Sequence, residues 1–392
     1  MTVPATRPAI PLSRFAERLA GARRATADNG LAALLVGVGA DLRFLTGYAA
    51  MALERLTMLV VPAAPDSPLT LVVPRLEVDP AGRASAPRGG LVAIRTWEET
   101  DDPHALVAGL VGESTPGGIV GVAINDSLPA GHVLRLQAAL PGVRFVLGST
   151  VTRELRIVKD ADEIELLRAA AEAADRVVDQ IAAGPLVGRT EADVSLEVRE
   201  RLVAEGHDSA DFAIVASGPN AASPHHHASD RVIATGEPIV LDIGGPLGGY
   251  GSDTTRTLWV TGGSASARPT GEFLAAFAVL RRAQAAATAA VRPGITAEAI
   301  DAAARDIIAA AGYGPNFIHR TGHGIGLEEH EDPYLVAGND VPLRAGMEFS
   351  IEPGIYVEGK WGMRLEDIVV CGPDGPDTLN RSDLDLRVVD GR

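Results

Sequence analysis

Acidic residues interrupt apolar, strand-like segments at four places in the C-terminal half of this 392-residue chain. The segments PIVLDIGG, GSDTTRT, FSIEPGIY and MRLEDIVV contain, in order, Asp242, Asp253, Glu352 and Glu366. Burying a carboxylate in such a segment is unfavourable unless a cation or hydrogen-bond donors compensate its charge. The chain must therefore fold so that each of these four carboxylates lies near a compensating positive charge or is exposed to solvent.

The four carboxylates form two pairs along the sequence. Asp242 is expected to end an apolar strand, and Asp253 follows it across GGPLGGYGS, which is typical of a hairpin connection. Glu352 and Glu366 repeat this arrangement, because each is expected within a strand on one side of the turn segment VEGKWG. A single Asp at a strand end is more often a turn residue. A hairpin, however, would place both members of a pair on neighbouring strands.

Histidines gather in two glycine- or proline-containing segments of the same half. His323 lies in TGHGIG between His319 and His330, and the run His225–His227 follows SGPN. Four carboxylates and one imidazole are too many hard ligands for one structural zinc, and they suit two divalent cations that share carboxylates. If these groups converge in space, the sequence predicts a metallohydrolase.

Charge and cysteine content exclude several other classes of protein. The net charge of −16 argues against nucleic acid and anionic membranes as partners. The single cysteine, Cys371, excludes an internal disulfide. The apolar run LAALLVGVGA is too short to span a bilayer. A cytoplasmic protein is therefore expected.

The length of the chain suggests about two domains. Residues 10–155 alternate between helical and strand patterns, which predicts a smaller α/β domain. Residues 160–392 combine long helices with strands joined by short turns, which predicts an α+β domain. The Ala-rich helical segment from Asp160 to Ala183 is expected to form the hinge between them. Thr190 with Glu191 is a near match to helix-capping chemistry.

Six sequence blocks resemble those of the creatinase/prolidase/methionine-aminopeptidase family, in that family's order. They are ASGPNAASPH, LDIGG, SDTTRT, HRTGHGIGLEEHEDPY, GMEFSIEPGIY and RLEDIV. The resemblance covers residues from about 160 to 385, and it extends more loosely to the family's N-terminal domain over residues from about 10 to 150. It is closest to bacterial Xaa-Pro dipeptidases and Xaa-Pro aminopeptidases. It implies a C-terminal pita-bread metallopeptidase domain preceded by a creatinase-type N-terminal domain.

The resemblance also implies a complete set of metal ligands. Asp253 and Glu366 would bridge two divalent ions, Asp242 would complete one site, and His323 and Glu352 would complete the other. The ions are expected to be Mn²⁺, with Co²⁺ or Zn²⁺ as alternatives.

Further residues match the family's substrate-handling positions. The implied catalytic residues are Glu352, which would also move a proton, His330, which would stabilise the transition state, and His225. His226 and His227 depart from the small residues usual there, so the choice within this run stays open. The implied substrate-binding residues are His319, Arg364 and His226, and Arg364 is alternatively a partner of the metal ligands.

The expected activity is hydrolysis of Xaa-Pro peptide bonds, most simply in dipeptides, by a hydroxide that bridges the two ions. The substrate is therefore a small peptide with Pro at its second position, and a homodimer is expected from the resemblance. One alternative is an Xaa-Pro aminopeptidase that acts on longer peptides, and Arg320 and Arg364 are candidates for the carboxylate-binding group that would distinguish the two. A hydrolase of a small non-peptide metabolite and a binding protein of the same fold are two further hypotheses.

Overall fold

The computed structural model describes residues 8–115, 118 and 120–392, which form two compact units. One unit runs from Ile10 to Arg156 and the other contains Ile157–Arg392. Helix α8 (Ala161–Ala183) packs on strands of the second unit. The prediction that this segment forms the hinge is therefore wrong, because the apolar face that produced its helical pattern is buried in the core of one unit. In the described part of the chain, no helix is long and apolar enough to cross a membrane.

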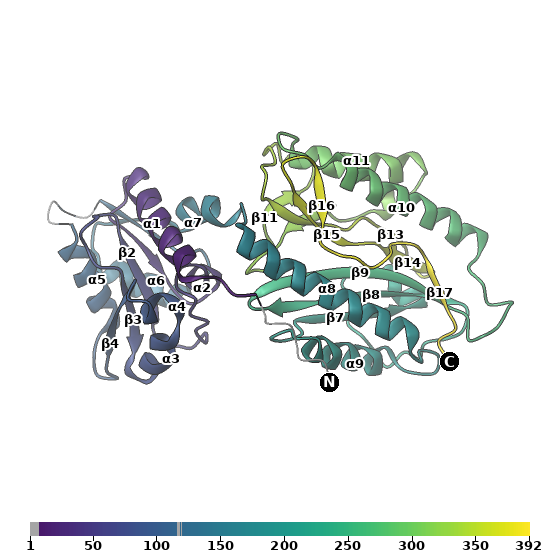
Figure 1. Cartoon of the computed structure of the whole chain (residues 1–392), viewed down its shortest axis with the longest axis horizontal. Coiled ribbons are helices and arrows are strands. Elements are labelled where there is room, and N and C mark those ends of the chain that lie inside the picture. The colour runs from purple at the N-terminus through teal and green to yellow at the C-terminus, as the bar shows by residue number, and fades with distance from the viewer. Residues whose placement is uncertain (1–7, 116–117, 119) are drawn as a thin grey trace. The chain divides into compact units, whose positions relative to one another are not determined.

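The first unit is an α/β domain built on one mixed sheet (Figure 1). Its strand order is β4-β3-β2-β1-β5-β6, and the pairs β3/β4, β1/β5 and β5/β6 are parallel. The strands are β1 (Ala33–Val36), β2 (Met58–Pro62), β3 (Thr70–Pro74), β4 (Ala93–Trp97), β5 (Gly121–Ile124) and β6 (Arg144–Leu147). The helices are α1 (Leu12–Asp28), α2 (Ala40–Thr46), α3 (Val78–Arg83), α4 (Ser85–Arg88), α5 (Pro103–Glu113), α6 (Ala130–Ala139) and α7 (Ser149–Arg156). The inner strands are buried throughout and almost entirely apolar, because helices cover both faces of the sheet (Figure 1).

The second unit contains four long helices and three sheets. Its helices are α8, α9 (Glu191–Ala204), α10 (Gly271–Ala290) and α11 (Ala297–Ala310). A four-stranded sheet has the order β17-β9-β8-β7, made of β7 (Phe212–Ser217), β8 (Glu237–Leu247), β9 (Tyr250–Val260) and β17 (Arg387–Val389). A five-stranded sheet has the order β11-β10-β12-β15-β16, made of β10 (Gly322–Gly324), β11 (Glu331–Leu335), β12 (Glu348–Ile351), β15 (Asp367–Cys371) and β16 (Pro376–Thr378). A two-stranded hairpin completes the set with β13 (Gly354–Val357) and β14 (Trp361–Arg364).

Two helix pairs cover the strands of this unit on opposite sides (Figure 1). Apolar residues of α8 and α9 form one core with β7, β8 and β9. Apolar residues of α10 and α11 form a second core with β12 to β15. The strands between these cores can carry polar side chains only where a cavity or a set of hydrogen bonds receives them.

The strands that carry the acidic residues differ in detail from the sequence prediction. Asp242 lies in the middle of β8 and does not end it, because the strand continues through the glycines to Leu247. The turn itself is Gly248-Gly249, and both glycines have positive φ angles. Glu352 and Glu366 lie just outside strands rather than within them. Pro353 ends β12 beyond Glu352, since proline cannot donate to the ladder.

Candidate metal centre

All the site residues predicted from the sequence line one cavity of the second unit, with a volume of about 970 Å³. The five candidate ligands in its wall are Asp242, Asp253, His323, Glu352 and Glu366. The wall also contains the other six candidates, Arg320, His319, His330, Arg364, His225 and His226. The sequence motifs are scattered over more than a hundred residues, and the fold brings them to one place.

Strand pairing positions the carboxylates. In the β8/β9 hairpin, Asp242 lies opposite Thr255, and Asp253 lies two residues from Thr255 on the same face of β9. Glu366 is attached to this hairpin by its backbone, because its N–H donates to the Thr255 carbonyl over 3.1 Å. Glu352 follows directly after the residue that pairs with Asp367, so it lies across the β12/β15 ladder from Glu366. The β8/β9 hairpin thus contributes the pair Asp242 and Asp253, and the β12/β15 ladder contributes the pair Glu352 and Glu366.

The imidazole of His323 is oriented for binding a cation through Nε2. Its Nδ1 lies 3.1 Å from the Gly324 carbonyl oxygen, so Nδ1 carries the proton and donates. Its Nε2 lies 3.3 Å from Glu352 Oε1 and 3.5 Å from Asp253 Oδ2. A Cβ atom on the flanking Gly322 would lie 1.9 Å from the Ser350 carbonyl oxygen, which explains why glycine is required in this strand.

The side chains present fit divalent cations. Ligand atoms of Asp253, His323 and Glu366 all lie within 4.8 Å of one another. Asp242 Oδ1 and Glu366 Oε1 are buried and have no hydrogen-bond partner in the structure. Two orphaned carboxylate oxygens beside the Nε2 atom of His323 are compensated most simply by metal ions.

The pKa shifts of the clustered carboxylates also indicate a site for cations. Burial, followed by the charges of Asp242 and Glu329, raises the pKa of Asp253 well above its ordinary value. Burial, followed by the neighbouring Asp253, raises the pKa of Glu366 in the same way. Burial also raises the pKa of Glu352 to about 7, although the nearby His323 opposes the shift. Without cations, the protein must hold protons to bury these like charges together.

Arg364 is the internal counter-ion of the cluster. It is buried, and its Nη2 donates to Asp242 Oδ2. Its Nε donates to Thr255 Oγ1 over 3.1 Å, and its Nη1 donates to the Tyr356 hydroxyl over 2.8 Å. Thr255 in turn donates to Glu366 Oε2 over 2.6 Å. Because these internal contacts occupy the guanidinium, the geometry favours Arg364 as a partner of the ligands rather than a substrate-binding group.

The candidate histidines differ in whether their ring nitrogens are free to hydrogen-bond to a substrate. His319 Nδ1 donates to the Arg320 carbonyl over 2.7 Å, and its Nε2 accepts from the Tyr356 hydroxyl over 2.9 Å. Its ring nitrogens are therefore both occupied, and burial lowers its pKa to about 4. Burial lowers the pKa of His330 to about 4 as well, so this ring is neutral near pH 7. Its Nδ1 faces Arg320 Nη2 at 3.3 Å, which leaves Nε2–H as the donor.

Glu191 organises the histidine run, and the sequence analysis did not find this role. Thr190 does cap α9, but it pairs with Asp193. The fully buried Glu191 carboxylate instead accepts from His226 Nε2 over 2.7 Å and from the backbone and hydroxyl of both Ser217 and Ser229. His226 is thereby fixed, whereas His225 stays available to the cavity. The only signal in the sequence was a Glu at the start of a helix.

We expect Glu191→Gln to weaken the stability of the fold. Burial alone would raise the pKa of Glu191, but hydrogen bonds from Ser229, Ser217 and His226 lower it from 4.5 to about 2. A lowered folded-state pKa adds stability that is present above pH 4.5 and is lost as the pH falls towards 2. The variant should therefore unfold with a flatter pH dependence in this range and lose about 1–3 kcal/mol at pH 7. Urea unfolding across pH measures this, and Glu200→Gln, on an exposed site of the same helix, should match the wild type.

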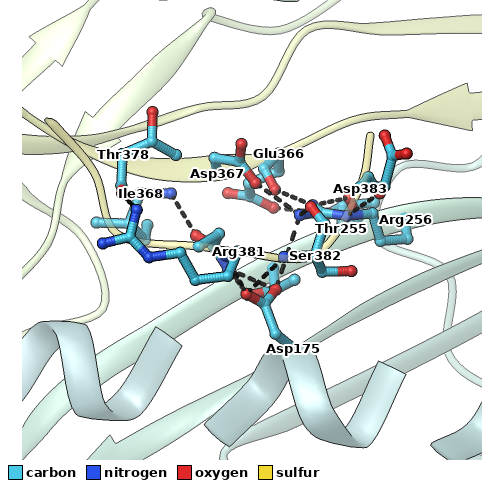
Figure 2. A network of polar contacts seen from close by, with 12 residues as sticks. Asp175, Thr255, Arg256, Glu366, Asp367, Ile368, Thr378, Arg381, Ser382 and Asp383 are labelled. Atoms are coloured by element: carbon cyan, nitrogen blue, oxygen red, sulfur yellow. Dashed lines mark hydrogen bonds and ion pairs between the residues drawn. The ribbon is translucent and has the colours of Figure 1, made fainter. Parts of the chain in front are cut away.

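A second polar network contacts the backbone of Glu366 and the residues next to it (Figure 2). Arg256 is 1% exposed, and its Nη1 donates to the Glu366 carbonyl over 2.5 Å. Its Nη2 donates to Asp367 Oδ1 over 2.7 Å and lies 3.7 Å from Asp175 Oδ1. Asp175 also accepts from the backbone N–H groups of Arg381 and Ser382. The network therefore joins α8, β9 and the C-terminal segment at the point where Glu366 enters the cavity.

Comparisons with known proteins agree with this geometry. Residues 165–373 match the metallopeptidase family M24, and residues 18–158 match the creatinase/prolidase N-terminal domain. The chain belongs to metallopeptidase family M24. The resemblance seen in the sequence, the M24 pita-bread fold and the preceding creatinase-type domain are thus confirmed.

Several relatives of this M24 chain carry the name dipeptidase. It is 48% identical to the "Probable dipeptidase PepE" of Mycobacterium tuberculosis, over 96% of each chain. It is 35% identical to the Xaa-Pro dipeptidase of Lactobacillus helveticus, over 88% of this chain and 92% of the relative. The crystal structure of dipeptidase PepE from Mycobacterium ulcerans superposes with a TM-score of 0.89 at 47% identity, covering 97% of this chain and 99% of that one. The protein is therefore an enzyme, a peptidase of the M24 family.

Proposed function

We propose that this protein is an Xaa-Pro dipeptidase that uses two divalent metal ions, most simply Mn²⁺. The observation that carries the proposal is the cluster of four carboxylates and one imidazole, His323, in the wall of the cavity, with two buried carboxylate oxygens that have no hydrogen-bond partner. The assigned ligands are Asp242, Asp253, His323, Glu352 and Glu366, within a catalytic domain of residues 160–392. Oxygen-rich donor sets suit Mn²⁺.

The ions, when bound, would polarise the scissile carbonyl and lower the pKa of a water molecule. Glu352 would carry the proton of the attacking water to the leaving nitrogen. Its carboxylate is suited to this role because Ser350 donates to Oε1 over 3.2 Å and fixes its orientation. His330 would donate from Nε2–H to the oxyanion that develops on the substrate carbonyl. His225, which lines the same cavity, would contact the substrate.

Proline at the second position has a physical consequence for such a site. The Xaa-Pro bond is a tertiary amide, so the substrate offers no N–H at the leaving nitrogen for recognition. A pocket for this substrate must instead recognise ring surface and the two charged ends. His319 would provide ring surface, because both of its nitrogens already have partners inside the protein.

Hydrolysis of Ala-Pro by the protein reconstituted with Mn²⁺ tests the proposal. We expect turnover of Ala-Pro and much slower turnover of Ala-Ala under the same conditions. Ala-Pro-Ala-Ala in parallel distinguishes the expected dipeptidase from an aminopeptidase. Failure to hydrolyse any Xaa-Pro peptide at metal saturation would refute the proposal.

Metal removal should also lower thermal stability. A ligand that binds only the folded state at about 1,000 times its Kd stabilises it by about 4 kcal/mol. For a domain of this size, that corresponds to a shift in Tm of about 10 °C. Thermal unfolding with EDTA and then with added Mn²⁺ should show this difference, and equal Tm values would contradict tight binding.

A further inference from the structure

Arg320 lies in the wall of the cavity and is held on two sides. Its Nη2 is 3.3 Å from His330 Nδ1, and its guanidinium carbon is 4.6 Å from the centre of the Tyr334 ring. The side chain is half-buried. These contacts restrict the guanidinium before any ligand binds, so little further side-chain freedom would be lost on binding an anion.

Arg320 also lacks a counter-ion. Within residues 8–115, 118 and 120–392, no carboxylate lies within 4.0 Å of its guanidinium nitrogens, and the contact with His330 uses one of its five N–H donors. The cavity's other two arginines differ from Arg320 either in pairing or in burial. Arg364 is paired with Asp242, and the exposed Arg199 donates to the Ala210 carbonyl over 2.7 Å. Arg320 therefore presents a half-buried guanidinium in the cavity wall, with N–H donors available to bind a ligand.

The charges of the cavity are segregated around this group. The carboxylate of Glu329 interacts with Asp211, Asp242 and His323, and it therefore belongs to the acidic part of the wall. The guanidinium of Arg320 lies instead against His330 and Tyr334. A zwitterionic substrate, with an ammonium at one end and a carboxylate at the other, matches such a distribution.

We propose that Arg320 binds the free α-carboxylate of the substrate and so restricts the enzyme to dipeptides. The inference rests on the proposed Xaa-Pro peptidase activity and names the feature of the substrate that is recognised. A guanidinium fork binds a carboxylate through two parallel hydrogen bonds, which fixes the position of the C-terminal residue as well as its charge. Because Arg320 also touches His330, a carboxylate held there would lie beside the group assigned to the oxyanion.

The test compares Ala-Pro with its C-terminal amide, Ala-Pro-NH₂, which keeps the scissile bond and loses the charge. We expect the wild type to prefer the free acid by at least about 10-fold in kcat/KM, because the amide would leave the half-buried guanidinium of Arg320 without its partner. Arg320→Gln should remove most of this preference, chiefly by raising KM for Ala-Pro. Activity on the amide should change little, because the amide offers no carboxylate for Arg320 to bind.

Two further variants separate binding from structure. Arg320→Lys keeps the charge without the fork and should retain part of the preference. Arg199→Gln removes an arginine of the same cavity and should leave the preference unchanged. If Arg320 only supported His330, Arg320→Gln would lower kcat/KM for acid and amide equally.

The outcomes decide between the two proposals. Equal kcat/KM values for acid and amide in the wild type, or an unchanged preference in Arg320→Gln, would overturn the role of Arg320 and leave the peptidase proposal intact. Hydrolysis of neither substrate by the metal-loaded wild type would instead overturn the peptidase proposal.

Discussion

Asp253→Asn is expected to reduce kcat/KM by roughly 10³-fold or more, because activation of water and polarisation of the carbonyl would be lost together. The neutral amide has one carbonyl oxygen and no negative charge, so it could not replace a carboxylate that two cations would share. Metal content, measured on the purified protein, should fall in parallel. The Mn²⁺-dependent rise in Tm should also shrink.

The same substitution should not destabilise the metal-free protein. Burial and the neighbouring carboxylates raise the pKa of Asp253 well above its usual range, so its charged form is unfavourable without cations. We therefore expect the Tm of Asp253→Asn in EDTA to equal or exceed that of the wild type. Asp374→Asn, at an exposed turn, is the matched control and should change neither metal content nor activity. Full metal content in Asp253→Asn would contradict the assignment.

Arg256→Met is expected to cause the largest loss of stability. The substitution leaves Asp367 and Asp175 without their buried cation, and breaking a buried pair in this way costs about 3–5 kcal/mol. For a unit of this size, Tm should fall by about 10 °C. Burial already raises the pKa of Asp367 despite the nearby Arg256, so the variant should take up a proton at this position.

Arg381→Met provides the control for this prediction. Arg381 belongs to the same network through its backbone N–H, whereas its side chain is 59% exposed and lies 3.8 Å from Glu172. An exposed ion pair of this kind contributes only about 0–1 kcal/mol. Thermal unfolding should therefore separate the two arginine variants clearly. Similar Tm values for both would show that the buried network does not stabilise this part of the fold.

The fold class and the convergence of the candidate residues could be anticipated from the sequence. Apolar strands interrupted by Asp242 and Asp253 predicted a hairpin with both carboxylates on neighbouring strands, and β8 and β9 form that hairpin. The glycines around His323 predicted close backbone approach, and a Cβ at Gly322 would collide with the Ser350 carbonyl. These inferences succeeded because each rests on local chemistry and on the alternation of side chains along a strand.

Contacts between distant segments could not be anticipated in the same way. Helical periodicity in residues 161–183 shows that one face is buried, but it does not show which unit covers that face. Glu191 was interpreted as a capping residue, although its carboxylate receives donors from residues far along the chain, including His226. The partners of Arg364 decide whether it binds substrate or supports Asp242, and they depend on how two sheets meet. The sequence alone therefore left Arg320 and Arg364 as equal candidates.

Metal stoichiometry measured together with hydrolysis of Ala-Pro tests the central claim most directly. Titration of the metal-free protein with Mn²⁺ should show two ions bound per chain, and activity should rise with occupancy. In Asp253→Asn, both binding and hydrolysis should be lost. Hydrolysis that proceeds without bound metal, or two bound ions with no hydrolysis of any Xaa-Pro peptide, would contradict the account.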